Sequence, residues 1–283
     1  NRHGKGIEYY DNDKNTKMYE GDWSENKRHG KGVSYYENGN KLYEGDYSDG
    51  NKWQGKGIKY YDNDKNTKMY EGDYSESNRH GKGIQYDSNG NKQYEGDYSD
   101  GNWHGKGIWY WPNGNKEYEG DWSEGRKHGK GISYYDNDNN TKQYEGDVSD
   151  GKSHGKGISY FLNGKKKYEG DWSEGLPNGK GIEYYDNDKN TKEYEGDFEN
   201  GKRHGKGIEY YDNDNNTKEY EGDYSENKRH GKGIWYYDNG KKWYEGDWSE
   251  GKRHGKGISY RANGNKEYEG DFENGKRHGK GIE

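Results

Sequence analysis

The 283-residue chain contains no cysteine, only two prolines and few aliphatic side chains. Without cysteine no disulfide can form, and both an extracellular and a cytoplasmic scaffold remain open. No apolar run approaches the length that a membrane-spanning helix needs. Because hydrophobic residues make up only 23% of the chain, a thick globular core is also excluded.

Charge of a single sign is missing as well. The 47 basic and 54 acidic residues are interleaved and leave a net charge of −7. A surface that binds nucleic acid or an anionic membrane needs a sustained basic stripe, which this chain lacks. The sequence therefore predicts no nucleic-acid partner and argues against a membrane partner.

Aromatic residues and glycine are abundant, with 33 Tyr, 10 Trp and 49 Gly in a repeating order. Disordered chains are poor in aromatics, so this composition favours an ordered structure held by ring contacts. The tetrapeptide YEGD returns every 24 to 27 residues. It begins at Tyr19, Tyr43, Tyr70, Tyr94, Tyr118, Tyr144, Tyr168, Tyr194, Tyr220, Tyr244 and Tyr268. We expect one continuous repeat array over residues 1–283, in which no repeat is stable alone.

Two polar connections divide each repeat into two short strands. One connection carries Asn-Gly, as at Asn38-Gly39, or the longer DNDKNT, as at residues 11–16, and Asn-Gly predicts a type I′ turn with positive φ at both residues. The other connection is SENKR or SEGKR. The strands between them, K-x-Y-E-G-D-W and G-K-G-I-x-Y-Y, are too short and glycine-rich for helices. The predicted fold class is all-β, an elongated array of antiparallel hairpins in one long twisted sheet.

Alternation along the first strand places Tyr19, Gly21 and Trp23 on one face and Glu20 and Asp22 on the other. A glycine between two aromatic residues leaves room for a neighbouring ring to lie over the backbone. We therefore predict a structural ladder of rings seated over glycines. Its members are Tyr19, Trp23, Tyr43, Tyr47, Tyr70, Tyr74, Trp122, Trp172 and Trp248. Acidic first strands beside basic second strands would also pair opposite charges.

The pattern Y-E-G-D-W, followed by H-G-K-G-I, resembles the MORN repeat (membrane occupation and recognition nexus). The match rests on Tyr43, Gly45, Tyr47, Gly55 and Gly57 in one repeat and on the equivalent residues in the others. The resemblance implies a twisted antiparallel sheet of successive hairpins. Members of the family commonly serve as scaffolds, dimerise or sit beside membranes, often as accessories to a catalytic domain. The DNDKNT insertions depart from the usual family spacing.

Two short motifs have an alternative to a purely structural role, namely metal binding and glycosylation. The DNDKN loops alternate oxygen-bearing side chains as calcium sites do, and a solvated turn is the alternative. The calcium candidates are Asp11, Asp13, Asn15, Asp62, Asp64 and Asn66. Asn139 and Asn215 begin N-N-T sequons, which are meaningful only in a secretory pathway. No cofactor site and no catalytic set is predicted, because a lone active site would break the periodicity.

The function predicted from the sequence is that of a non-enzymatic structural or scaffold protein, either a segment of a long array or a filament-forming subunit. Its partners would be other copies of itself, joined end to end or laterally, or other proteins. The alternative is a protein- or glycan-binding module with an exposed Tyr/Trp surface. That surface would comprise Trp53, Trp103, Trp109, Trp111, Trp235 and Trp243. A phospholipid-associated scaffold is a third hypothesis, against which the net acidity argues.

Overall fold

The computed structural model describes residues 2–12, 14–63 and 65–282, and this part of the chain is built from 23 β-strands. The prediction of an all-β fold of antiparallel hairpins is confirmed. The described residues include no helix with the length and apolarity needed to cross a lipid bilayer.

The strands fall into two compact units, residues 1–140 and residues 141–283. The first unit contains β1 (Gly4–Tyr9), β2 (Lys17–Ser24), β3 (Lys27–Tyr35), β4 (Lys41–Ser48), β5 (Lys52–Tyr60), β6 (Lys68–Ser75), β7 (Asn78–Tyr86), β8 (Lys92–Ser99), β9 (Asn102–Tyr110), β10 (Lys116–Ser123) and β11 (Arg126–Tyr134). The second contains β12 (Lys142–Ser149), β13 (Lys152–Tyr160), β14 (Lys166–Ser173), β15 (Leu176–Tyr184), β16 (Lys192–Glu199), β17 (Lys202–Tyr210), β18 (Lys218–Ser225), β19 (Lys228–Tyr236), β20 (Lys242–Ser249), β21 (Lys252–Tyr260), β22 (Lys266–Glu273) and β23 (Lys276–Ile282).

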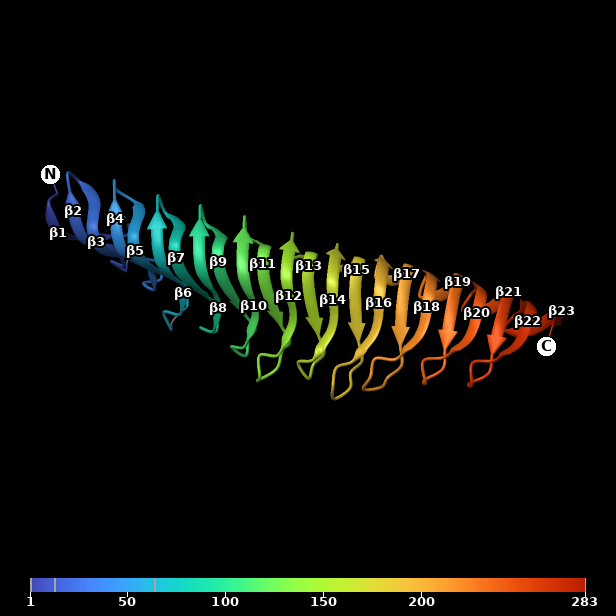
Figure 1. The fold of residues 1–283 in the computed structure, drawn as a ribbon. Coiled ribbons are helices and arrows are strands. Elements are labelled where there is room, and N and C mark those ends of the chain that lie inside the picture. Colours follow the sequence, from blue (N-terminus) through green and yellow to red (C-terminus); the bar gives the residue numbers. More distant parts are fainter. Residues whose placement is uncertain (1, 13, 64, 283) are drawn as a thin grey trace. The chain divides into compact units, whose positions relative to one another are not determined.

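Within each unit every strand pairs antiparallel with the strand before and after it in the chain, which gives an open sheet of consecutive hairpins (Figure 1). Short and long connections alternate along the chain. Because successive strands run in opposite directions, each kind of connection gathers at its own edge of the sheet. Most of the length variation between repeats therefore lies at one edge; at the other edge only the β4–β5 turn, residues 49–51, is one residue longer than the two-residue turns of the described chain.

The tight type I′ turn, predicted at the Asn-Gly connection, lies instead at the other connection of the repeat. Ser24 pairs with Lys27, so Glu25 and Asn26 form a two-residue turn with φ of 51° and 66°, as a type I′ turn requires. At Asn38-Gly39 only the glycine has positive φ, at 94°. The amide of Tyr36 donates to the carbonyl of Asn40 at 2.8 Å, which makes this a three-residue loop with a glycine bulge. The predicted type I′ turn at Asn-Gly is wrong, because the third loop residue changes the preferred turn.

A bulge bends the sheet in the middle of each repeat. In the second unit Gly222 pairs with Gly233, but the next residue, Asp223, pairs with His230. Gly231 and Lys232 of β19 thus lie between these two consecutive pairs. The carboxylate of Asp223 accepts a hydrogen bond from the backbone amide of Lys232 at 3.0 Å. A bulge of this kind increases the local bend and twist of the strand.

The core is one layer of tyrosine rings lying on paired glycines. Tyr220 is fully buried, and its hydroxyl donates to the carbonyl of Asp223 at 3.2 Å. A Cβ at Gly222 would lie 2.5 Å from the Tyr220 hydroxyl, from the Gly233 Cα and from the Lys232 carbonyl oxygen. The equivalent tyrosines of the other repeats are also buried. The backbone of the glycine pair therefore takes the place of a second layer of side chains beneath each ring.

Replacing Gly222 by alanine is expected to destabilise the second unit by at least about 2 kcal/mol, since backbone and ring must move to admit the methyl group. Urea unfolding monitored by tryptophan fluorescence measures this change. Gly251→Asn is the matched control, because Gly251 has open space around it and Asn227 occupies the equivalent turn position with positive φ. Equal stabilities of the two variants would contradict the proposed crowding.

Alkaline pH is expected to unfold the protein through this tyrosine layer. Burial, reinforced by the neighbouring carboxylate of Asp22, raises the pKa of Tyr19 to about 12, and burial also raises the pKa of Tyr144 to about 12. An unfolded tyrosine releases its proton near pH 10, so the folded state binds more protons than the unfolded state above that value. Stability is thus complete below about pH 10 and falls between about pH 10 and 12. Tyrosinate absorbance and circular dichroism should change together, and tyrosines that ionise near pH 10 in an intact sheet would refute the expectation.

Candidate functional site

The predicted aromatic ladder residues lie on one face of each sheet. In the first unit the ring of Tyr19 contacts Trp23 edge-on at 5.4 Å and Tyr47 of the next hairpin at 5.0 Å. In the second unit Tyr168 and Trp172 meet edge-on at 5.1 Å. The remaining predicted members make the same kind of contact, namely Tyr43, Tyr70, Tyr74, Trp122 and Trp248. Each edge-on pair adds about 0.5–1.5 kcal/mol beyond the burial of area.

Arg, Lys and Trp side chains from the residue before the His slot lie over the outer side of the tyrosine rings and form a cover. The sequence analysis did not predict this cover. Arg28 lies 4.8 Å over Tyr19, Lys127 lies 4.9 Å over Tyr118, and Trp53 stacks on Tyr43 at 4.4 Å. The signal is present in the sequence, since ten of twelve repeats carry Arg, Trp or Lys in this slot and only Ser153 and Pro177 differ. A cation over a ring contributes about 0.5–2 kcal/mol, depending on burial.

The exposed Tyr/Trp surface needs correction. All six tryptophans assigned to it are half-buried. Ring contacts place five of them in the aromatic layer and its cover, namely Trp53, Trp103, Trp109, Trp235 and Trp243. Trp235, for example, lies 3.9 Å from Trp243 and is covered by Arg229 at 5.0 Å. In a chain with so few aliphatic residues, the rings pack against one another and are not left free for a ligand.

Two buried arginines join the repeats of the second unit through shared glutamates. Arg229 contacts Glu209 at 2.6 Å and Glu219 at 2.5 Å, and its side chain is only 15% exposed. Arg203 contacts Glu209 as well, at 3.1 Å, and Glu183 at 2.7 Å. Glu209 thus links two successive cover arginines, so this ladder couples neighbouring hairpins.

Arg229→Met keeps the length of the side chain but leaves two partly buried carboxylates without their cation. We expect a loss of about 1–3 kcal/mol in urea unfolding, because removing one member of a buried pair costs more than the pair contributes. Adding Glu209→Gln to this variant should recover part of the loss. Lys206→Met, which removes a 74% exposed cation, is the control and should change stability by less than about 1 kcal/mol. Similar losses in the two single variants would contradict a structural role for the ladder.

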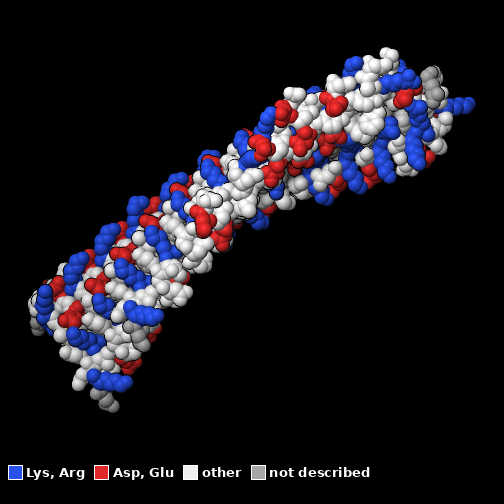
Figure 2. Space-filling model, turned by 90° about the horizontal axis from the view of Figure 1, so that it is seen from below, with Lys and Arg blue, Asp and Glu red and all other residues white. Residues whose placement is uncertain are grey.

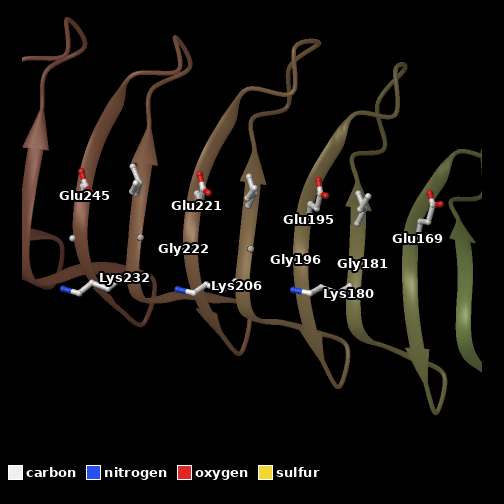
Figure 3. Close-up of a pocket in the computed structure, with 16 residues that line it drawn as sticks. Glu169, Lys180, Gly181, Glu195, Gly196, Lys206, Glu221, Gly222, Lys232 and Glu245 are labelled. Atoms are coloured by element: carbon white, nitrogen blue, oxygen red, sulfur yellow. The ribbon is translucent and has the colours of Figure 1, made fainter.

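The opposite face of each sheet forms a groove. Figure 3 shows its construction in the second unit, with glutamates of the YEGD strands along one side, lysines of the GKG segments along the other, and glycines between them. Register places Glu195 directly opposite Ile182 and Ile208, so carboxylates and half-buried isoleucines alternate in the first row. The floor is the strand backbone at the glycine pairs, whose Cβ directions point to the aromatic face.

The groove occurs in both units with the same chemistry. In the second unit it encloses about 990 Å³ and runs over β14–β20. In the first unit it encloses about 860 Å³ and is lined by the equivalent Lys, Gly, Val or Ile, and Glu residues of β3–β8. These volumes lie in the range of ligand-binding clefts, but each groove crosses several repeats and is open along its length.

One wall of the groove is a row of lysines tied to aspartates. Lys206 contacts Asp223 of the next strand at 2.5 Å, and Lys180 contacts Asp197 in the same way. Burial by itself would raise the pKa of Asp223, but hydrogen bonds from Lys206 and from the Lys232 amide outweigh it and lower the pKa. This wall confirms the predicted pairing of acidic and basic strands. The lysines remain 73–74% exposed, so each ammonium keeps donors for a ligand.

The other wall presents the glutamates. Lys192, three residues away in the same strand, contacts Glu195 at 2.7 Å, and the Tyr210 hydroxyl donates to the same carboxylate at 3.2 Å. The hydrogen bond from Lys192 lowers the pKa of Glu195. Burial and the Glu195 charge together raise the pKa of Tyr210 to about 12. At neutral pH the groove is therefore lined by lysine ammonium groups on one side and by glutamate carboxylates on the other, and each of these groups is already paired with an opposite charge beside it. On the molecular face displayed in Figure 2, basic and acidic side chains are interspersed.

Two of the calcium candidates, Asp62 and Asn66, form hydrogen bonds with the preceding loop. The Asp62 carboxylate accepts hydrogen bonds from Asn38 at 2.7 Å and Asn40 at 3.1 Å, and the Asn66 side chain accepts from the Lys41 amide. These contacts tie each loop to the preceding one. Asp13 and Asp64 lie outside the described residues. Among the described residues no group of three His, Cys, Asp or Glu side chains could hold a metal ion. Calcium binding by the DNDKN loops stays a prediction of the sequence.

The two sequons lie in the longer loops. Asn139 and Asn215 are both exposed, so their side chains are sterically accessible to a modifying enzyme. Their glycosylation stays a prediction of the sequence.

Comparison with known families matches the MORN repeat along most of the chain. The matched segments are residues 1–14, 19–41, 70–92, 94–116, 118–139, 144–166, 168–189, 194–215, 220–242, 244–266 and 268–283. No curated protein matches. Among solved structures, one described as a crystal structure of TcdB2-TccC3-TEV aligns with 87% of this chain at 10% identity and a TM-score of 0.17. This chain spans 15% of that protein, and so low a score carries no argument about fold or function.

Proposed function

The chain belongs to the MORN repeat family, whose repeats are generally non-catalytic binding or scaffold modules, and from this premise we propose that it is a scaffold whose grooves hold extended segments of partner proteins. The observation that carries the proposal is the groove itself. The same glycine floor and the same two charged walls occur in both units. A feature renewed in repeat after repeat suits a partner that extends along many repeats.

The shape of the groove favours a polypeptide strand over a globular partner. It crosses seven strands in the second unit and is only as wide as the glycine pairs and their flanking residues. On the aromatic face, Arg, Trp and Lys side chains cover most of the tyrosines, so these rings are less accessible to the rings or sugars of a ligand. Half-buried isoleucines in the groove supply apolar area that a partner would cover.

Selection from a phage-displayed library of random linear peptides tests this function. Peptides that use the groove should bind the unaltered protein and lose at least tenfold in affinity on Ile208→Arg, which places a long cation in the groove. Leu162→Arg is the matched control, since Leu162 is 63% exposed in a loop outside the groove. The proposed function fails if no selected peptide distinguishes these two variants, while circular dichroism shows both to be folded.

Self-assembly into a filament or a longer array stays a prediction of the sequence. Negative-stain electron microscopy at several protein concentrations tests it, with concentration-dependent filaments as the expected result. Flotation with anionic liposomes tests the phospholipid hypothesis, and the net charge of −7 predicts no association.

A further inference from the structure

We propose that the segment held in each groove is a polyproline II helix whose sequence repeats every three residues, with one small residue or proline, one basic residue and one acidic residue. This inference rests on the proposed function and names the chemical class of the partner. Two properties of the groove carry it, namely its repeat distance and the separation of its lining lysines and lining glutamates into two rows.

The repeat distance of the groove matches polyproline II. Paired strands lie about 4.8 Å apart, so a two-strand repeat advances by about 9.6 Å. Three residues of polyproline II advance by about 9.3 Å and complete one turn, so every third side chain returns to the same edge of the helix. Each repeat of the groove can therefore contact the same residue type of the bound segment.

Other extended or helical conformations do not keep the same phase. A β-strand advances by about 9.9 Å in three residues, but its side chains alternate between faces, so successive repeats would meet opposite faces. An α-helix needs seven residues, about 10.5 Å, to return to nearly the same face, and it drifts by about 1 Å per repeat. Polyproline II alone among these combines the distance with the phase.

The three edges of a polyproline II helix correspond to the three surfaces of the groove. One edge lies on the glycine floor, where only a small residue or proline fits closely. A second edge faces Glu195 and Glu221, with Ile208 between them, and this row suits an Arg or Lys whose aliphatic stem covers the isoleucine while its head group meets a carboxylate. The third edge faces Lys180, Lys206 and Lys232, whose exposed ammonium groups suit Asp or Glu.

The length of the groove sets the number of matched residues. From Glu169 to Glu245 it crosses seven strands, or six inter-strand spacings of about 4.8 Å, which is about 29 Å. Nine residues of polyproline II cover about 28 Å. Exposed ion pairs are individually weak, so specificity must come from several in register on a conformation that is already extended before binding.

The direct test uses a fluorescein-labelled peptide, (Pro-Arg-Glu)4, in fluorescence anisotropy titrations with the full chain. The matched control peptide repeats Pro-Arg-Glu-Pro-Glu-Arg twice, with identical composition, length and proline spacing. Its charged residues change edges in alternate turns, so half of them face a wall of like charge in either direction of binding. We expect the control to bind at least tenfold more weakly. We expect (Pro-Glu-Arg)4 to bind as well as (Pro-Arg-Glu)4, because a peptide bound in the reverse direction presents its arginine edge and its glutamate edge to exchanged sides of the groove.

Protein variants locate the binding. The double variant Glu195→Gln/Glu221→Gln should weaken binding of (Pro-Arg-Glu)4 at least tenfold, whereas Glu250→Gln, at a turn outside the groove, should leave it unchanged. Equal affinities for the matched and control peptides, or no binding of either, would overturn the proposal. If library peptides still depend on Ile208 while lacking a three-residue period, the groove function stands and only this inference fails. If no library peptide depends on Ile208, both fail.

Discussion

The whole structure depends on a tyrosine ring lying flat on the backbone of two paired glycines. Tyr220 occupies the space that side chains at Gly222 and Gly233 would fill, and its hydroxyl satisfies the Asp223 carbonyl. A ring can therefore be fully buried by a single sheet, without a second layer of secondary structure. This explains how a chain with only 23% hydrophobic residues can be ordered. It also explains why glycine is needed at positions where alternation would otherwise place a large residue.

The same contact gives each sheet two faces of different chemistry. Rings, indoles and cover arginines collect on one face and close it to solvent. On the other face the backbone of the glycine positions forms the floor between a row that contains Glu195 and a row that contains Lys206. The proposed binding groove and the core thus share the same stretch of strand backbone. A side chain at a glycine position would point to the aromatic face and would alter the groove only through the backbone shift that it causes.

Much of this architecture follows from the sequence, because strand alternation and repeat length depend on local pattern. Tyr19 and Trp23 share a face through simple periodicity, and their rings are in contact. The turn types did not follow, since the choice between Asn38-Gly39 and Glu25-Asn26 for the tight turn depends on register across the hairpin. The cover role of Arg229 and the groove beside Glu195 were also missed. Repeated charges look like an ordinary solvated surface until bulges and pairing show which of them face one another.

The sorting of connections to separate edges has an evolutionary consequence. One edge of each sheet is made of two-residue turns, except between β4 and β5, where residues 49–51 form the turn and the pairing of Gly45 with Gly57 is kept. The other edge already accepts both three-residue and longer loops, as the DNDKNT segments demonstrate. New sequence can enter there without altering the pitch or the chemistry of either face. The fold thereby gathers most of its diversification at one margin, while the opposite margin stays nearly constant.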